Sequence, residues 1–502
     1  MTYDPTWESL RAHRVPTWFS DAKFGIWAHW GPQCVAESGD WYARHLYGPH
    51  PSNAEWEVRR PRRQHAHHLA NYGPPSEFGY KDLLPLWGAE RFDAEALMEL
   101  YAASGARYFM SLAVHCDNFA LWDSQEQPWN AARIGPRRDI VAEWERAARN
   151  AGLPFGLSFH NNWTWRWLDT AHGTDTDTDL PHDGRLTRAD GSGLWWDGLD
   201  PHDLYLRPRS PGIPPDPAWI ARFWRMVREA TDRFEPDSVY FDDLRLPFDE
   251  GSELPAAPPD REGLRFLADY YARSRSGGVV TIKNVPDADR TAVVLDSERR
   301  QLDTIQQHPW QFDTSDGEWF RCVSDEDIFH PRKSARQVIR TLIDVVSKNG
   351  TLLLNIPQSA DGTIDEHSRR LLEDVGAWLR ICGDGVYGTR PWRVHGEGPT
   401  ALAAAEGYNE ADLYFSAADV RYTAAGGTVY ATLLGWPENG EAVLRVFGRE
   451  DGPVTGATLL GWGPVELRQE DDGLHIRLPE ASPTKHAGMI RIDRGRRKIE
   501  TR

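Results

Sequence analysis

Acidic and imidazole side chains stand at the ends of several predicted strands in the first three-quarters of the sequence. If these strands run parallel around a barrel, their carboxyl ends share one face, and the side chains that follow them can meet there. Two carboxylates that face one pocket can cleave a glycosidic bond, because one attacks or stabilises the anomeric carbon while the other protonates the leaving oxygen. The residues in these positions are His29, His115, His160, Asp242, Asp243, and Asp296 to Glu298.

The elements that would position these side chains form repeated strand–helix units. Up to about residue 385, short apolar runs alternate with amphipathic helical patterns, which is typical of an α/β fold with parallel strands. Strands are expected at residues 24–29, 107–115, 154–159, 238–242, 279–283, 292–296 and 351–356, with one more near 302–305. Helices are expected at residues 92–104, 139–151, 218–234, 334–348 and 365–381. The pattern predicts a (β/α)8-like TIM barrel as a catalytic domain over residues 1–386.

The rest of the chain divides into long rim segments and a second domain. Residues 50–87 and 169–213 are rich in Pro, Gly, His and Asp and are predicted to be long loops around the active face. After about residue 387 the pattern changes to short strands separated by Gly and Pro turns. These strands are expected at residues 411–415, 428–434, 442–445, 457–460, 474–478 and 489–492. Residues 387–502 are therefore predicted to form a C-terminal antiparallel β-sandwich.

Charge and composition exclude several classes of partner. The 502 residues carry a formal net charge of −18, which disfavours binding to nucleic acids and to anionic membranes. The sequence contains no run of about 18 apolar residues, which is the length needed to span a membrane. The start of the sequence lacks a signal-peptide pattern, so a cytoplasmic location is expected. The four cysteines have no CxxC spacing, which is typical of thiols in a reducing compartment.

The sequence predicts no cofactor. A phosphate-binding GxxxxGK[ST] loop is absent, which disfavours nucleotide binding. The stretch His65-Ala66-His67-His68 matches no common metal-ligand spacing, so we interpret it as a rim loop or substrate contact rather than a metal site. The expected partner is an oligosaccharide or glycoside substrate, and homo-oligomerisation is left open.

A series of motifs extends in order along nearly the whole chain. It begins with Trp-Phe-Ser-Asp-Ala-Lys-Phe-Gly-Ile-Trp-Ala-His-Trp-Gly at residues 18–31. Further motifs lie at residues 41–42, 91–95, 105–108, 119–124, 138–141, 236–242, 347–356, 360–364, 387–392 and 434–437. Together they resemble glycoside hydrolase family 29, the α-L-fucosidases. The resemblance implies an exo-acting, retaining enzyme that releases terminal α-L-fucose, or a closely related sugar, from glycoconjugates or oligosaccharides.

The resemblance also implies which carboxylates react. The family's nucleophile is the Asp that ends a Pro-Asp-x-x-x-Phe-Asp motif, which falls on Asp242, whereas a loop cap is the alternative role for such an Asp. Asp296-Ser297-Glu298-Arg299 resembles the family's acid/base segment, so Glu298 is the expected acid/base. Glu318 is the competing candidate. A surface ion pair with Arg299 or Arg300 is the alternative role for Glu298.

The sugar pocket of the family has counterparts here, together with departures. The positions of His29, Trp41 and His115 match family pocket positions. The predicted substrate contacts are His29, Asp40, Trp41, His115, His160 and Trp310. Asp40 replaces a Glu, Cys116 replaces a second His, and residues 158–162 replace a Tyr-rich strand end. These departures leave three alternatives open, namely a related sugar such as L-galactose, an inverting geometry, or an inactive sugar-binding homologue.

Overall fold

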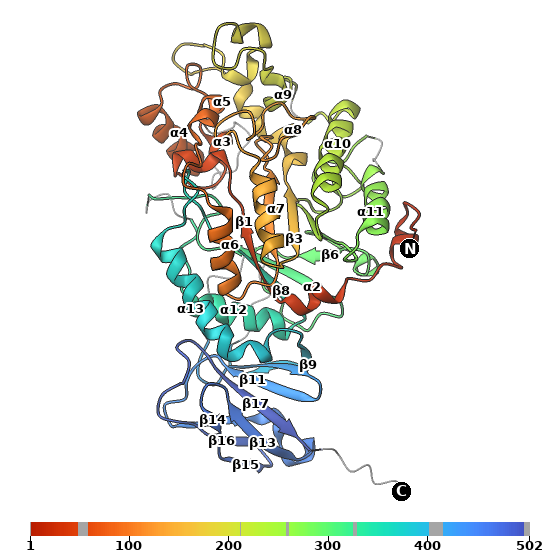
Figure 1. Ribbon diagram of the computed structural model, residues 1–502, viewed down its shortest axis with the longest axis vertical. Coiled ribbons are helices and arrows are strands. Elements are labelled where there is room, and N and C mark those ends of the chain that lie inside the picture. Colours follow the sequence, from red (N-terminus) through yellow and green to blue (C-terminus); the bar gives the residue numbers. More distant parts are fainter. Residues whose placement is uncertain are drawn as a thin grey trace.

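The N-terminal part of the chain is a closed barrel of eight parallel strands that pair in sequence order, β1 to β8 (Figure 1). The computed structural model describes residues 2–48, 59–210, 212–257, 261–324, 329–400 and 415–495. All eight strands are buried, because helices cover the outside and side chains fill the interior. The predicted TIM barrel is confirmed. The strands are β1 Phe24–Ala28, β2 Phe109–Val114, β3 Phe155–Phe159, β4 Ser238–Phe241, β5 Val279–Ile282, β6 Val294–Asp296, β7 Trp310–Ser315 and β8 Gly350–Asn355.

The strand predicted near residues 302–305 is wrong, because β7 lies at Trp310–Ser315. Three alternate residues of β7 are polar, and their side chains bond inside the barrel. Gln311 donates to Asp296, Asp313 accepts from Tyr240, and Ser315 accepts from Asn355. Because these inward residues are polar, β7 lacks the continuous apolar run from which strands were predicted.

Helices surround the barrel, and most of the long ones begin at a side-chain cap. Five of them follow an Asp or Ser whose side chain accepts a hydrogen bond from the first turn, which satisfies an otherwise unpaired backbone N–H. The long helices are α6 Ala94–Ala103, α7 Ile140–Asn150, α10 Pro217–Phe234, α11 Glu262–Arg273, α12 Ala335–Ser347 and α13 Glu366–Cys382. The short helices include α1 Trp7–Leu10, α2 Thr17–Ala22, α3 Tyr42–His45, α8 Thr164–Trp167 and α9 Pro201–Tyr205. None of the described helices has both the length and the apolar character that a membrane crossing requires.

The rim segment predicted as a loop over residues 50–87 contains helices, α4 Arg59–Asn71 and α5 Tyr80–Leu83, while residues 49–58 lie outside the described residues. The sequence of α4 lacks an apolar stripe, so no helical periodicity was visible. Polar contacts hold it instead. Gln64 donates to the carbonyls of Ser38 and Asp40, and His68 bonds to Tyr42. The second rim segment, 169–213, has short turns and α9.

The C-terminal part is an antiparallel β-sandwich, as predicted. A six-stranded sheet in the order β14-β13-β17-β11-β10-β9 faces a three-stranded sheet, β12-β16-β15, across a separate apolar core. The predicted division after residue 386 falls in the connection between α13 and β9; of the predicted strand 411–415, residues 411–414 lie outside the described residues. The strands are β9 Arg390–Glu397, β10 Val420–Ala425, β11 Thr428–Leu433, β12 Glu441–Leu444, β13 Val454–Leu459, β14 Gly463–Pro464, β15 Leu467–Glu470, β16 Gly473–Arg477 and β17 Gly488–Arg494.

A buried ion triad joins the two parts. Asp344 on α12 accepts from Lys348 at 2.6 Å and from Arg421 of β10 at 2.6 Å, and all three side chains are almost wholly excluded from solvent. The two cations outweigh the cost of burial and hold the pKa of Asp344 below its usual value. The sandwich therefore packs on the helices next to the amino ends of the strands, and the rim segments lie at the opposite end (Figure 1).

The Asp344→Ala variant is expected to lose about 3–5 kcal/mol of unfolding free energy, because two buried cations lose their counterion. Urea unfolding followed by tryptophan fluorescence measures this loss. The matched control is Asp374→Ala, which removes an exposed partner of Lys485 and should cost about 0–1 kcal/mol. Equal losses in the two variants would contradict the structural role of the triad.

Candidate active site

Asp242 follows β4 at the mouth of the barrel and is held by two donors. Its Oδ1 lies 2.6 Å from Nζ of Lys283, and its Oδ2 lies 3.1 Å from Nδ1 of His160. Burial favours the neutral acid, but the ammonium of Lys283 and the hydrogen bond from His160 outweigh it and hold the pKa of Asp242 well below its usual value. Asp242 is therefore an anion whose orientation is fixed.

Glu298 meets Asp242 at the same ammonium group. Lys283 donates to Oε2 of Glu298 as well as to Oδ1 of Asp242, and Trp319 donates to Oε1 of Glu298 at 3.2 Å. Two oxygens that both contact one nitrogen lie no more than about 5 Å apart, which is closer than the roughly 6.5–9.5 Å between the carboxyl groups of inverting glycosidases. The structure thus brings together the two carboxylates predicted to react.

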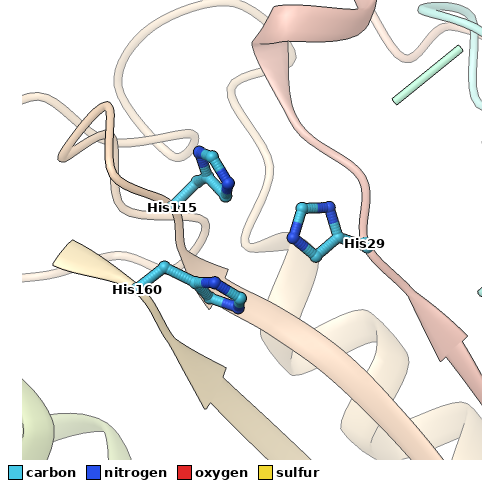
Figure 2. A group of neighbouring side chains, drawn as sticks. All are labelled: His29, His115 and His160. Atoms are coloured by element: carbon cyan, nitrogen blue, oxygen red, sulfur yellow. The ribbon is translucent and has the colours of Figure 1, made fainter. Parts of the chain in front are cut away.

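Three buried histidines follow three consecutive strands, and their rings lie close together (Figure 2). The ring centroids of His29 lie 5.1 Å from those of His115 and of His160, and the latter two are 5.3 Å apart. Burial is the largest influence on His29 and His115 and holds the pKa of both rings well below the usual value, so both are neutral. A neutral imidazole offers one donor and one acceptor.

The hydrogen-bond network assigns the protons on two of these rings. Nε2 of Gln33 lies 2.8 Å from Nδ1 of His115 and 3.0 Å from a carboxylate oxygen of Asp117. The amide therefore donates to both, and the proton of His115 is on Nε2. In His160, Nδ1 faces Asp242, and Nε2, the acceptor of the ring in its neutral form, is buried and has no partner among the described residues. One donor and one acceptor side by side suit a hydroxyl group, which both accepts and donates.

The same assignment bears on metal binding. Among the described residues, two groups have potential ligand atoms close enough to share an ion, and the histidine trio, with its atoms within 4.8 Å of one another, is the buried one. A metal needs a lone pair from each ring, whereas Nδ1 of His115 is occupied by Gln33 and its Nε2 carries the proton. The arrangement of the trio favours a sugar hydroxyl over a metal ion.

The other predicted pocket residues have different places. Trp41 precedes α3 with 47% of its surface exposed and meets Trp167 edge-on at 6.3 Å, so it is available to a ligand. Asp40 is buried, and its carboxylate accepts from the backbone N–H of Phe320 at 2.8 Å. The ring of Phe320 contacts His29, so Asp40 supports the pocket from behind rather than lining it.

Trp310 does not reach the site. It is the first residue of β7, is wholly buried, and donates from its indole nitrogen to the carbonyl of Lys348. The amino end of a parallel strand lies at the face of the barrel opposite the pocket. Placing the strand at 302–305 would have put Trp310 after its carboxyl end, and this error explains the misplaced contact.

Glu318, the competing acid/base, is fully engaged elsewhere. It accepts from Arg60 at 2.8 Å and from the backbone N–H groups of Phe329 and His330 at 2.6 and 2.9 Å. Burial opposes its charge, but Arg60 and a hydrogen bond from Asp40 lower the pKa of Glu318 below its usual value. An anion held in this way is a poor proton donor, so the geometry favours Glu298.

Asp243 caps the loop that follows β4. Its carboxylate accepts from the backbone of Glu253 at 2.8 Å and from Asn162 at 3.0 Å. Burial raises the pKa of Asp243 to about 7. Its contacts therefore match the role of a loop cap.

Two functional residues were missed by the sequence analysis. Lys283 stands at the end of a predicted strand, and this position was the signal that could have found it. Trp319 lies in the connection after β7, and no periodicity or motif indicated that its indole reaches both Glu298 and the ring of His29.

Comparison with known proteins gives the family. The sequence pattern of the family described as Alpha-L-fucosidase matches residues 1–384, and that of the Alpha-L-fucosidase C-terminal domain matches residues 415–493. The chain belongs to the α-L-fucosidase family. This member is 27% identical to human plasma alpha-L-fucosidase, covering 95% of this chain and 89% of that protein. It is 26% identical to mouse tissue alpha-L-fucosidase, covering 96% and 92% of the two chains.

Solved structures agree with this family assignment. The chain is similar to the crystal structure of Thermotoga maritima alpha-fucosidase in complex with a mechanism-based inhibitor, with a TM-score of 0.69 and 25% identity over 98% of this chain and 99% of that one. This fucosidase-family member is thus a glycoside hydrolase with the barrel-and-sandwich architecture of its relatives.

Proposed function

We propose that the protein is an exo-acting, retaining α-L-fucosidase in which Asp242 is the nucleophile and Glu298 the acid/base. The observation that supports these roles is the shared contact with Lys283, because it holds the two carboxylates closer together than the roughly 6.5–9.5 Å that inversion requires. The names of the relatives and the histidine pocket support fucose as the sugar released.

The reaction follows from these positions. A carboxylate oxygen of Asp242 attacks the anomeric carbon while Glu298 gives its proton to the leaving oxygen, which leaves a glycosyl ester on Asp242 and an ionised Glu298. Glu298 then takes a proton from water, whose oxygen attacks the same carbon and releases Asp242. Two inversions restore the original configuration.

A panel of 4-nitrophenyl glycosides tests this proposal. Release of nitrophenol from the α-L-fucoside should exceed release from the α-L-galactoside and from β-glycosides, and proton NMR should show α-L-fucose as the first sugar formed. Release of the β-anomer first would contradict the nucleophilic role of Asp242. Sugar binding without turnover on any member of the panel would contradict the enzyme assignment of the pocket.

The charge of Lys283 predicts a change in pH dependence. In Lys283→Met, the pKa of Asp242 rises because its strongest stabilising charge is lost. Since the nucleophile must be ionised, the acidic limb of kcat/KM is expected to move to higher pH by about one unit or more. The control Lys283→Arg keeps the charge and should keep the limb near its original position. An unchanged limb in Lys283→Met would show that Lys283 does not set the ionisation of Asp242.

The cellular location expected from the sequence, the cytoplasm, stays a prediction. All four cysteines lie in the described part of the chain, and none of them forms a disulfide. Burial raises the pKa of the thiols of Cys34, Cys116 and Cys382, which keeps them protonated and unreactive. The substrate is a glycoside or oligosaccharide.

A further inference from the structure

A second pair of carboxyl groups lies inside the barrel, and the proposed reaction does not use it. Asp296 is the last residue of β6, Asp313 lies in the middle of β7, and both are buried. Alternate residues of a barrel strand point inward and stack in layers. Asp296 is therefore one layer below Glu298, as Tyr240 is one layer below Asp242.

One tyrosine hydroxyl connects the two carboxyl groups. The hydroxyl of Tyr240 lies 3.3 Å from Oδ2 of Asp296 and 3.3 Å from Oδ2 of Asp313. A hydroxyl has a single proton to donate, so it satisfies two oxygens best when it donates to an ionised carboxylate and accepts from a protonated one. Two adjacent buried anions would repel each other strongly, whereas one shared proton removes the repulsion.

The surroundings fix the pair and link it to the catalytic layer. Gln311 donates to Oδ1 of Asp296 at 2.9 Å, and Tyr108, the residue before β2, donates to Gln311 at 3.3 Å. The backbone carbonyls of Gln311 and Asp313 accept from the residues on either side of Glu298, at 2.8 and 2.9 Å. The segment that holds Glu298 is therefore fastened to the strand that carries Asp313.

Other charged and titratable groups also act on the pair. Lys283 and Glu298 lie close enough to interact with it electrostatically, and Asp242 interacts with Tyr240. His160 of the neighbouring strand stacks on Tyr240 at 5.7 Å. Burial, the largest influence, raises the pKa of Asp296 to about 7 and that of Asp313 well above its usual value, which is consistent with one retained proton.

We propose that Asp296 and Asp313 share one proton and present a single fixed negative charge beneath the catalytic carboxylates, and that this charge weakens the acidity of Glu298 so that it keeps its proton until the leaving group departs. The charge also offsets that of Lys283, which would otherwise favour loss of the proton. Asp296 and Asp313 are thus positioning residues that act through Glu298, and this role rests on the proposed function of Glu298 as the acid/base.

The first test asks whether the shared proton exists and is independent of catalysis. Infrared spectra of the wild type and of Asp313→Asn are compared near neutral pH. The wild type should show a carboxylic-acid C=O band that disappears in the variant, because the amide introduced in place of Asp313 then donates to an ionised Asp296. A difference spectrum without this band would overturn the shared proton.

The second test asks whether the charge acts on Glu298. In Asp313→Asn one negative charge remains, so the basic limb of kcat/KM should stay within about 0.3 unit of the wild type. In Asp296→Asn/Asp313→Asn the charge is lost, and the basic limb should move to lower pH by about one unit. An equal shift in the single and double variants, or no shift in either, would overturn the proposal.

Two features keep these outcomes distinct. If the double variant does not fold, the infrared band still decides whether the proton is shared, and a shifted basic limb in Asp313→Asn would still overturn the proposed action on Glu298. If the wild type has no activity on aryl glycosides, the proposed function of Glu298 fails, while the infrared comparison still reports on the proton.

Discussion

Asp242→Gly is expected to lose about 10⁴-fold or more of kcat/KM on aryl α-L-fucosides, because it removes the carboxylate proposed to attack the anomeric carbon. Removal of the side chain leaves space for a small anion. Azide should therefore restore nitrophenol release and give a fucosyl azide of the opposite configuration, since only one displacement then occurs. Product configuration by NMR is the measurement that decides.

The matched control for this variant is the adjacent carboxylate. The carboxylate of Asp243 accepts from backbone N–H groups of the loop that follows. Asp243→Asn is expected to reduce kcat/KM by less than about tenfold, with no response to azide. A large, azide-rescued loss in Asp243→Asn, together with near-normal activity of Asp242→Gly, would exchange the roles of the two residues.

Glu298→Ala is expected to show a loss that depends on the leaving group. General acid catalysis contributes about 10²–10⁴-fold, and it matters most when the leaving oxygen is strongly basic. Natural fucosides, whose leaving groups are sugar hydroxyls, should therefore lose most of their turnover. Aryl fucosides with an acidic phenol should be affected much less in the first step. The slope of log kcat/KM against the pKa of the leaving phenol measures the effect.

Glu318→Gln is the variant that separates the two candidate acids. Glu318 accepts from Arg60 and from two backbone N–H groups. Glu318→Gln should therefore weaken these contacts of the rim segments. It should not change the slope of log kcat/KM against the pKa of the leaving phenol. A steep slope in Glu318→Gln and a shallow one in Glu298→Ala would transfer the acid/base role to Glu318.

Much of the barrel could be predicted because its strands are apolar on both faces. Phe24–Ala28 and Phe155–Phe159 are buried throughout, so a continuous apolar run marks them. The strand β7 was missed by this criterion because its inward residues are polar and bond to side chains of other strands. The helix α4 was not predicted because Gln64 and His68, rather than an apolar stripe, attach it to the barrel. Apolar patterns in the sequence predict elements that are buried in apolar surroundings. They do not predict elements whose buried polar side chains are satisfied by hydrogen bonds.

The candidate site was predictable where a side chain follows a strand. Asp242 and the three histidines each stand directly after one, and the fold brings such positions together. The contacts of Asp40 and Trp319 could not be foreseen, since they depend on how the connections after β1 and β7 cross each other. The meeting of Asp242 with Glu298 through Lys283 likewise depends on three separate strands.

The placement of lysines has a practical consequence for handling the enzyme. Within the described residues, Lys23, Lys81 and Lys348 are buried, Lys283 is inside the pocket and Lys333 is half-buried, whereas Lys485 is exposed beside α13. Lys485 lies between β16 and β17 of the sandwich, and the sandwich lies at the end of the molecule opposite the rim segments (Figure 1). Of the described lysines, Lys485 is therefore the one that beads or electrodes with amine-reactive groups would couple to first, at the end of the molecule opposite the rim segments.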